Sequence, residues 1–309
     1  MDKRIVLLTG GGGMVGRNIL EHADAEDWNI VAPASQALDL TDFNATRRFF
    51  DAHRPDFVVH CAGRVGGIQA NMTHPVDFLV TNTDLARNVL LASRECGVKQ
   101  LLNLASSCMY PRHGANPLIE DTILTGELEP TNEGYALAKI FSMRLCQYLT
   151  QEDPTLKYKT IVPCNIYGQH DKFSPQHSHL IPAVIHKVHT AKAGGRDEVD
   201  IWGDGTARRE FMYAGDLAQG VLRALRRFDS LPGVINFGLG RDYSINEYYG
   251  AVAQVIGWKG RFVHDTNKPV GMKQKQVDVS RQQAWGWMPS TSLHTGIEAT
   301  YSYYLRNLA

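Results

Sequence analysis

Tyr135 and Lys139 are separated by four positions in the pattern Tyr-x-x-x-Lys. On a helix this spacing places a phenol and an ammonium on the same face. Because the positive charge favours the phenolate, we expect the pKa of Tyr135 to fall towards neutrality. Such a tyrosine can donate or accept a proton near pH 7. Chance copies of this pattern are common in helices, so its meaning depends on the residues that accompany it.

An upstream serine adds a second group that could act on the same substrate. Ser106 follows the apolar run 100–104, which predicts a buried strand. A hydroxyl at the end of a strand can bind the substrate oxygen that Tyr135 protonates. Together with a glycine loop near the N-terminus, at suitable intervals, Ser106, Tyr135 and Lys139 form a strong signal for a proton-transfer site.

The glycine loop follows the short apolar run 4–9, which is typical of a buried parallel strand, and a helix pattern begins soon after it. Its pattern G-x-x-G-x-x-G lets backbone N–H groups approach a pyrophosphate at the N-terminus of a helix. The surrounding apolar residues favour nucleotide binding over a flexible linker. The expected cofactor-binding residues in this loop are Gly10, Gly13, Met14, Val15 and Gly16.

The second predicted strand, 29–32, bears on which nicotinamide cofactor is bound. An NAD site usually carries an acid at the end of this strand, where it holds the ribose hydroxyls. The segment 32–36 has no acid, which favours NADP(H), although it has no arginine either. Asp39 is a candidate contact for the adenine amino group. It could equally cap a helix that starts near Asp42.

Strands and helices alternate through the first half of the chain, which predicts an α/β fold. We expect a Rossmann-type, doubly wound parallel sheet that binds NADP over residues 1–165. The alternation weakens beyond this point and predicts a smaller, interwoven C-terminal substrate lobe at 166–309. A strand and a helix around 211–240 are expected to return to the first domain. Other buried strands are expected at 57–61 and 159–163, and helices at 84–96 and 135–150.

Composition limits the classes of function. The 309 residues carry 32 Lys and Arg and 32 Asp and Glu, which argues against a strongly basic nucleic-acid surface. Five irregularly spaced cysteines predict no disulfide framework, and no Cys/His cluster predicts a metal site. No segment approaches the roughly 20 apolar residues of a membrane span. We therefore expect a cytoplasmic protein with no metal, nucleic-acid or membrane partner.

Two further features could contact a substrate. Gly67 lies in a loop with paired glycines that would suit a substrate contact, and a simple surface turn is the alternative. Arg208 and Arg209 follow a glycine turn, so at least one of them could hold a phosphate. A solvated pair of arginines is the alternative interpretation there.

Several motifs spread over nearly the whole chain carry a family resemblance: Val65-Gly66-Gly67-Ile68, Ser106-Ser107-Cys108-Met109-Tyr110-Pro111, 129–136, Asn165-Ile166-Tyr167-Gly168, 178–182, Trp202-Gly203, Arg209-Glu210-Phe211 and Lys268-Pro269. With them the chain resembles the GDP-L-fucose synthases, a group of extended short-chain dehydrogenase/reductases. The resemblance implies an NADPH-dependent epimerase and reductase. Such an enzyme inverts sugar carbons 3 and 5 beside a carbon-4 ketone and then reduces that ketone.

The resemblance also implies roles for individual residues. Cys108 resembles the family's base and His179 its acid, although alone they would be a packing cysteine and a structural loop histidine. Ser106 and Tyr135 at the ketone oxygen would stabilise the enolate. The pKa of a catalytic Cys108 should be lowered, so that the thiolate forms. The other implied contacts are Lys139, Asn165 and His179 to the cofactor, and Gly67, Asn165, Lys187, Trp202, Arg209 and Lys268 to the GDP-sugar.

The chain departs from the family pattern near both predicted binding sites. Gly12 and Lys187 stand where arginines are common, and Gln274-Lys275 replaces an Arg-Lys pair. These departures leave room for two related substrates. One is the 3,6-dideoxy substrate of a GDP-L-colitose synthase, in which only carbon 5 would be inverted. The other is a GDP-6-deoxyheptose, which would be reduced at carbon 4.

Other classes of protein with the same fold fit this sequence less well. A 4,6-dehydratase would carry an Asp-Glu pair where Ser107-Cys108 stands. A simple carbon-4 epimerase would have little use for Cys108 and His179. A non-catalytic, NADP-sensing protein usually loses the tyrosine or the lysine, and both are present. The family resemblance further implies a homodimer that pairs through the helices at 84–96 and 135–150.

Overall fold

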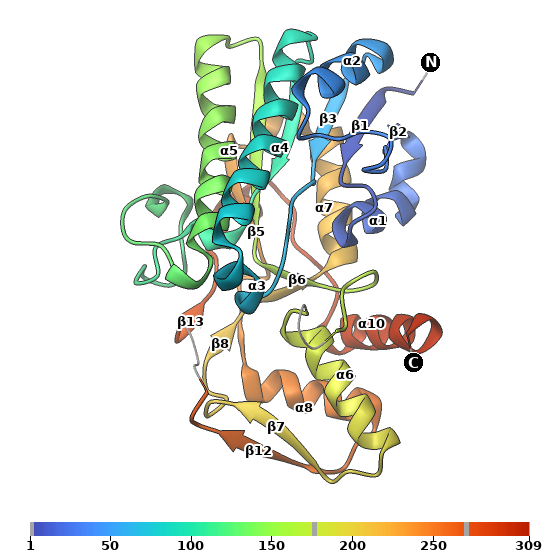
Figure 1. Cartoon of the computed structure of the whole chain (residues 1–309), viewed down its shortest axis with the longest axis vertical. Coiled ribbons are helices and arrows are strands. Elements are labelled where there is room, and N and C mark those ends of the chain that lie inside the picture. Colours follow the sequence, from blue (N-terminus) through green and yellow to red (C-terminus); the bar gives the residue numbers. More distant parts are fainter. Residues whose placement is uncertain (1–2, 175–177, 269–271, 309) are drawn as a thin grey trace.

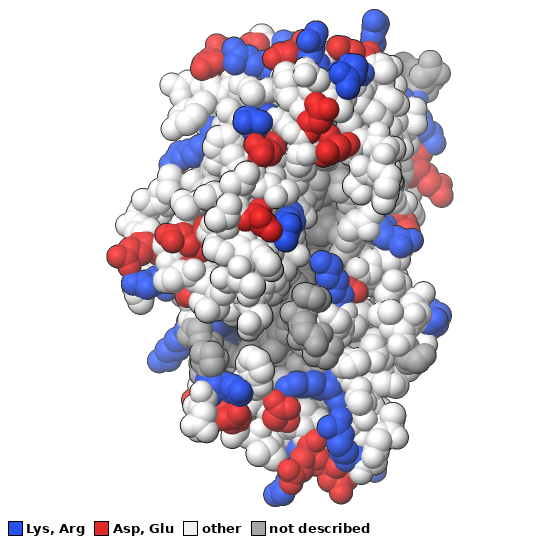
Figure 2. Space-filling view, viewed as in Figure 1, with Lys and Arg blue, Asp and Glu red and all other residues white. Residues whose placement is uncertain are grey.

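The computed structural model describes residues 3–174, 178–268 and 272–308. Pro269, which is part of one family motif, lies outside the described residues. Among those described, none of the helices combines the length and the apolar character that crossing a membrane requires. Acidic and basic side chains are interspersed on the face of the molecule shown in Figure 2.

A six-stranded parallel sheet, in the order β10-β5-β4-β3-β1-β2, forms the upper part of the molecule in Figure 1. Its strands are β1 (Ile5–Thr9), β2 (Asn29–Val31), β3 (Phe57–His60), β4 (Gln100–Leu104), β5 (Lys157–Pro163) and β10 (Val234–Phe237). The strand order reverses at β1, as expected of a doubly wound sheet. The predicted fold class is therefore confirmed.

Helices cover both faces of this sheet (Figure 1). One layer holds α2 (Phe43–His53), α4 (Pro75–Glu95) and α5 (Glu133–Glu152), and the other holds α1 (Met14–Glu21) and α7 (Ala214–Arg226). Within β1, Leu7 packs into a core with residues of α2 and α4, whereas Val6 and Leu8 pack into a core with residues of α1 and α7. Burial on both faces explains why this strand is a continuous apolar run.

The C-terminal half forms a second core. It is built by α6 (Leu180–Ala193), α8 (Ile245–Ile256) and α10 (Leu293–Asn307), with the parallel pair β7 (Glu198–Trp202) and β12 (Arg261–Asp265). β10 leaves this half and pairs with β5 in the main sheet. The smaller elements are β6 (Asn165–Tyr167), β9 (Phe211–Tyr213), β8 (Arg208–Arg209), β11 (Tyr243–Ser244), β13 (Gln274–Lys275), α3 (Ile68–Thr73) and α9 (Ser280–Ala284).

Several element boundaries differ from expectation. The helix expected at 84–96 begins at Pro75, whose fixed φ suits the first turn. Val76 and Val80 in this early part are exposed, and most of the buried residues of the helix come later. The last helix, α10, begins at Leu293. Asn132 occupies the N-cap position of α5 but makes no side-chain capping bond.

Candidate active site

A cavity of about 420 Å³ opens at the carboxyl ends of the parallel strands, where sheets of this kind bind ligands. Its wall is drawn from the glycine loop, the ends of β3 and β4, α5, β6, residues 170–172, His179 and β13. The cavity brings together eleven of the predicted site residues: Gly10, Gly13, Met14, Val15, Gly16, Ser106, Cys108, Tyr135, Lys139, Asn165 and His179.

The glycine loop has the shape of a cradle. Gly10 has a φ of +75°, and a Cβ there would lie 2.7 Å from the backbone nitrogen of Ala62. A Cβ on Gly16 would lie 2.3 Å from the carbonyl oxygen of Gly10, so larger residues are excluded from both positions. Gly13 is the N-cap of α1. At Gly12 a Cβ would meet nothing within 4 Å, so the loop stays open, as a pyrophosphate at a helix N-terminus requires.

Two buried oxygen atoms in the cavity wall fit a polar ligand such as a dinucleotide. Asn132 Oδ1 and Asp171 Oδ2 have no hydrogen-bond partner among the described residues. Burial raises the pKa of Asp171 to about 7, while the backbone N–H of Lys172 lowers it. Neither Asn132 nor Asp171 was predicted as a site residue. Asn132 ends a short 3-10 helix before α5 and Asp171 lies in a loop, and in such polar segments the sequence gives no signal that distinguishes a buried amide or carboxyl from an exposed one.

Tyr135 and Lys139 lie on one face of α5, as their spacing predicts, and both line the cavity. Lys139 Nζ lies 5.7 Å from the centre of the Tyr135 ring and donates to the carbonyl oxygen of Leu104 at 2.9 Å. The expected fall in the pKa of Tyr135 is wrong. Burial raises this pKa far above its ordinary value, and the hydrogen bond with the Ser106 hydroxyl opposes that rise. Burial also lowers the pKa of Lys139, because both charged forms lose contact with water.

Cys108 lies on a short turn, Ser107–Met109, directly after Ser106, and its thiol lines the same cavity. The expected lowering of its pKa is also wrong in direction. Burial raises the pKa of Cys108, and the charge of Lys275, the Ser106 hydroxyl and the charge of Lys139 oppose that rise. The packing-cysteine interpretation fits this burial, but Cys108 also faces a polar cavity with a cation.

His179 is the residue before α6 and also lines the cavity. Burial lowers its pKa, and the positive charges of Lys172 and Lys275 add to this effect. Cys108 and His179 therefore share one cavity, although they come from different lobes and are far apart in the sequence. Two groups that exchange protons with one substrate could be arranged in this way.

Three predicted substrate contacts, Lys187, Trp202 and Lys268, gather outside the cavity wall. The ammonium groups of Lys187 and Lys268 lie 5.9 and 5.5 Å from the centre of the Trp202 ring. Lys187 also pairs with Asp200 at 2.8 Å. The indole is 56% exposed. An exposed aromatic ring flanked by cations can stack on a nucleobase and attract phosphate groups.

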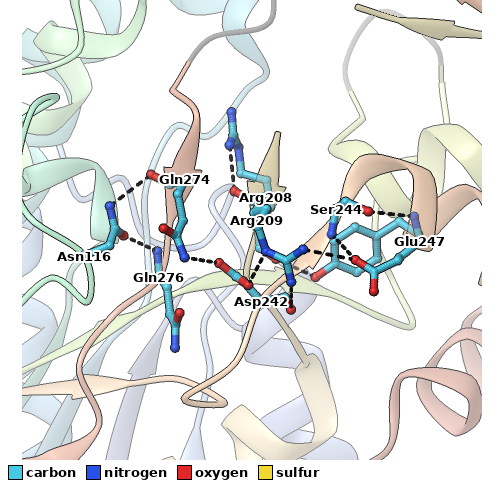
Figure 3. A network of polar contacts seen from close by, with 9 residues as sticks. Asn116, Arg208, Arg209, Asp242, Ser244, Glu247, Gln274 and Gln276 are labelled. Carbon is cyan, nitrogen blue, oxygen red and sulfur yellow. Dashed lines mark hydrogen bonds and ion pairs between the residues drawn. The ribbon is translucent and has the colours of Figure 1, made fainter. Parts of the chain in front are cut away.

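The two neighbouring arginines of β8 have different surroundings (Figure 3). Arg208 binds Asp242 at 2.7 Å and Glu247 at 3.4 Å, so its charge is paired within the lobe. Arg209 donates to the carbonyl oxygen of Arg208, and burial lowers its pKa. Arg209 therefore lies in a more buried setting than Arg208, and it stays a candidate for a phosphate contact.

The remaining predicted contacts lie outside the cavity lining. Gly67 is the N-cap of α3, and a Cβ on it would approach the carbonyl oxygen of Ser178 to 3.7 Å. Asp39 accepts from the backbone N–H of Thr41 at 2.9 Å, in an exposed turn. The cap of α2 is instead Asp42, which accepts from the backbone N–H of Ala45. The capping alternative for Asp39 is therefore wrong.

Lys275 is the clearest functional candidate that we did not predict. It lines the cavity and carries the charge that most strongly opposes the rise in the pKa of Cys108. Its strand, β13, has only two residues, so no apolar periodicity marks it. The only signal was the family's Arg-Lys pair, of which the lysine is retained.

Comparisons with known proteins agree with this geometry. The model of the NAD dependent epimerase/dehydratase family matches residues 6–238. The chain is 50% identical over 300 residues to a GDP-L-colitose synthase from Yersinia pseudotuberculosis, covering 97% of each chain. It is 49% identical over 300 residues to a GDP-L-fucose synthase from Azorhizobium caulinodans, covering 97% of this chain and 96% of that one.

The fold also matches solved structures. A GDP-6-OMe-4-keto-L-xylo-heptose reductase from C. jejuni superimposes with a TM-score of 0.91 at 27% identity, covering 99% of each chain. A GDP-mannoheptose C4 reductase from Campylobacter jejuni with NADP bound superimposes with a TM-score of 0.89 at 29% identity, again covering 99% of each chain. The family match runs through every strand of the parallel sheet, and the relatives extend it over the C-terminal lobe. The chain therefore belongs to the NAD dependent epimerase/dehydratase family.

Proposed function

We propose that this protein is an NADPH-dependent epimerase and reductase that acts on a GDP-4-keto-6-deoxy-mannose-type sugar and forms a GDP-L-fucose-like product. One observation carries the proposal: a single cavity beside the glycine loop holds Ser106, Cys108, Tyr135, Lys139 and His179. A simple reductase would need only part of this set. The thiol and the imidazole provide the two additional proton-exchanging groups that inversion requires.

Binding of the cofactor rests on the loop that opens at the N-terminus of α1. Its backbone N–H groups, from Gly12 to Met14, would hold the pyrophosphate. Lys139, Asn165 and His179 would hold the part of the cofactor that reaches the reaction centre. NADPH supplies the hydride for the reduction. NADP(H) is favoured over NAD(H) because no acid follows β2, and because the heptose reductase relative was solved with NADP bound.

Inversion of a carbon beside a ketone needs a base on one face of the sugar and an acid on the other. The Cys108 thiolate would remove the carbon-bound proton. The hydroxyls of Ser106 and Tyr135 would donate hydrogen bonds to the ketone oxygen as negative charge develops there. His179, from the opposite lobe, would return a proton to the other face of the carbon from its imidazolium form, which burial and the charges of Lys172 and Lys275 disfavour.

Reduction uses Tyr135 differently, as an acid that gives its proton to the carbon-4 oxygen. The raised pKa of Tyr135 keeps the phenol protonated at neutral pH, so it is ready to donate. Lys139 is held beside the phenol by the carbonyl oxygen of Leu104. Its charge would stabilise the phenolate that remains after proton transfer.

The identity of the sugar is the open choice within this proposal. Identity to the colitose synthase and to the fucose synthase is nearly equal, at 50% and 49%. A GDP-L-colitose synthase is thus the second candidate, and it would exchange only the proton at carbon 5. The solved heptose reductases make a GDP-6-deoxyheptose a third substrate to test.

One experiment separates these candidates. The purified protein is mixed with NADPH and each GDP-4-keto sugar in deuterated water, and the label is followed by NMR. Label at carbons 3 and 5 with oxidation of NADPH supports the fucose-type reaction, and label at carbon 5 alone supports the colitose-type reaction. Oxidation without label supports the heptose reductase, and no oxidation with any of these sugars would contradict the proposal.

We also infer a homodimer, because α4 and α5 pack against one another and carry exposed apolar side chains. These side chains are Val76, Val80, Leu137 and Tyr148. Light scattering tests this, since a dimer has twice the 34.4 kDa of one chain. The domain boundary at 165/166 and the cytoplasmic location stay predictions.

A further inference from the structure

The short strand β13 crosses the junction between the sheet and the C-terminal lobe (Figure 1). On one side it pairs in parallel with β8, where Gln274 lies opposite Arg208 and Lys275 opposite Arg209. The Gln274 side chain donates to Asp242 at 2.6 Å, and Arg208 binds the same carboxylate (Figure 3). The position of β13 in the lobe is therefore fixed by its side chains as well as by its backbone.

On its other side, β13 is tied to the segment that follows Cys108. The Asn116 side chain donates to the carbonyl oxygen of Gln274 at 3.3 Å and accepts from the backbone N–H of Gln276 at 2.9 Å (Figure 3). The backbone N–H of Leu118 donates to the carbonyl oxygen of Gln276 at 2.8 Å. These bonds bracket Lys275 and fix its backbone relative to the first half of the chain.

A buried carboxylate holds the chain just beyond Lys275. Glu210 accepts from the backbone N–H groups of Val277 at 2.8 Å, Leu239 at 2.6 Å and Gly240 at 3.0 Å. Glu210 is 1% exposed, so these bonds are shielded from water. Three independent supports thus fix the backbone around a single lysine that faces the cavity.

The ammonium group of Lys275 contrasts with that of Lys139. Lys139 donates to the carbonyl oxygen of Leu104. Within the described ranges, no protein group accepts a hydrogen bond from the side chain of Lys275. Its ionisable neighbours are Cys108, Cys164 and Glu129, whose negative forms favour the ammonium, and Arg209, which opposes it. Burial also opposes the charged form of Lys275. A cation in such surroundings is stabilised most directly by an anion that forms beside it.

Cys108 is a group that can become this anion inside the cavity. Both residues line the cavity wall, and each favours the charged form of the other. The alternatives are weaker: Tyr135 stays a phenol at neutral pH because burial raises its pKa, and Cys164 is held further from ionisation by the nearby Glu210. Lys139 also acts on Cys108, but less strongly than Lys275 does.

We propose that Lys275 is the counter-charge that allows Cys108 to act as a thiolate base. This inference rests on the proposed function and deepens it. In the proton-transfer step, the thiolate takes the proton from the sugar carbon and becomes a thiol, and the electron pair of the broken C–H bond moves to the ketone oxygen. Lys275 does not exchange a proton in this step. It is a positioning residue that acts through the charge of Cys108.

The test measures how fast iodoacetamide alkylates Cys108 as a function of pH, with the modified residue identified by mass spectrometry. Only the thiolate reacts, so the rate reports the ionised fraction directly. For Lys275→Met we expect the pH midpoint to rise by about one unit or more, and the rate at pH 7.5 to fall about tenfold. Lys275→Arg should restore most of the rate, because a guanidinium remains charged.

Lys273→Met is the matched control. It removes the same charge from an exposed position two residues away and should leave the profile unchanged. If Lys275→Met alters the fold, as judged by circular dichroism, Lys275→Arg and Lys275→Gln replace it as the charged and uncharged pair. An unchanged midpoint in the uncharged variant would overturn the inference. So would a rise in KM with an unchanged alkylation profile, because Lys275 would then bind substrate phosphate instead.

This measurement needs no substrate, so it separates the inference from the proposed function. The alkylation profile of Cys108 could shift in Lys275→Met as expected while the wild type exchanges no sugar proton in deuterated water. The proposed function would then fail, and the electrostatic pairing would stand. If the sugar exchanges its protons and the Lys275→Met profile is unchanged, the proposed function stands and the pairing fails.

Discussion

The cavity wall on the sheet side differs from the group formed by Lys187, Trp202 and Lys268 on the C-terminal lobe, which we call the rim. The two regions hold their charged residues in different ways. In the wall, Lys139 is 7% exposed and donates to a backbone carbonyl group. On the rim, Lys187 pairs with Asp200, and Trp202 is 56% exposed. Charges act strongly on one another where water is excluded and weakly at a surface. The wall is therefore suited to shift protons, and the rim to attract and orient a substrate.

Lys275 does not fit this division. It belongs to the C-terminal half of the sequence but lies in the wall, because β13 is held between β8 and the segment at 116–118. The charge that acts on Cys108 therefore depends on the contacts that join the C-terminal half to the first half of the chain. The predictions below test whether wall and rim differ as described, from the largest expected effect to the smallest.

Tyr135→Phe should have the largest effect, because it removes the wall's proton donor and little else. We expect turnover to fall by roughly 10²–10⁴-fold, the usual contribution of general acid catalysis. NADPH affinity should be nearly unchanged, since the glycine loop is untouched. Steady-state turnover and fluorescence titration with NADPH measure the two effects. Near-normal turnover would remove Tyr135 from the proposed mechanism.

Cys108→Ser should separate the two reactions proposed for this site, which are proton exchange at carbon 5 and reduction of the ketone. An alcohol is far harder to ionise than a thiol, so incorporation of deuterium at carbon 5 should fall by roughly 10²-fold or more. Oxidation of NADPH should persist in part and give a product of unchanged configuration, because Tyr135 and Lys139 remain. NMR of the product in deuterated water measures this. Wild-type labelling in the variant would show that Cys108 is not the base.

Trp202→Ala tests the rim. Stacking of a base on an aromatic ring is worth about 1–3 kcal/mol, so we expect KM for the GDP-sugar to rise by about tenfold or more. The value of kcat should hold, because the indole lies outside the cavity wall. Steady-state kinetics give both constants. A fall in kcat with constant KM would mean that the rim takes part in the chemistry and would break the comparison.

Asp171→Asn tests burial in the wall by its effect on stability. Burial raises the pKa of Asp171 to about 7, so the folded state binds this proton more tightly than the unfolded state does. The stabilisation is complete below the unfolded pKa and is lost as pH rises towards 7. Urea unfolding at pH 5 and at pH 8 gives the free energy of unfolding at each pH. Between these two values the variant should lose less of this free energy than the wild type does, by about 1–2 kcal/mol. Equal losses would show that the carboxyl is solvated.

Much of the scaffold could be predicted because its signals are local. Buried parallel strands are short apolar runs, and the glycine pattern between β1 and α1 marks a backbone that must turn tightly. Tyr135 and Lys139 share a face of α5 because four residues make about one turn. The start of α4 at Pro75 was not predicted, and Val76 and Val80 in this part are exposed.

The sequence by itself determined the parallel sheet, the glycine loop and the Tyr135–Lys139 pair, because each follows from the repeat of a strand or a helix. Only the tertiary structure decided that Lys275 lies in the same cavity as Cys108, and that burial raises the pKa values of Tyr135 and Cys108 where nearby charge predicts a fall. The reason is physical: desolvation depends on everything that packs around a group, including residues distant in the sequence.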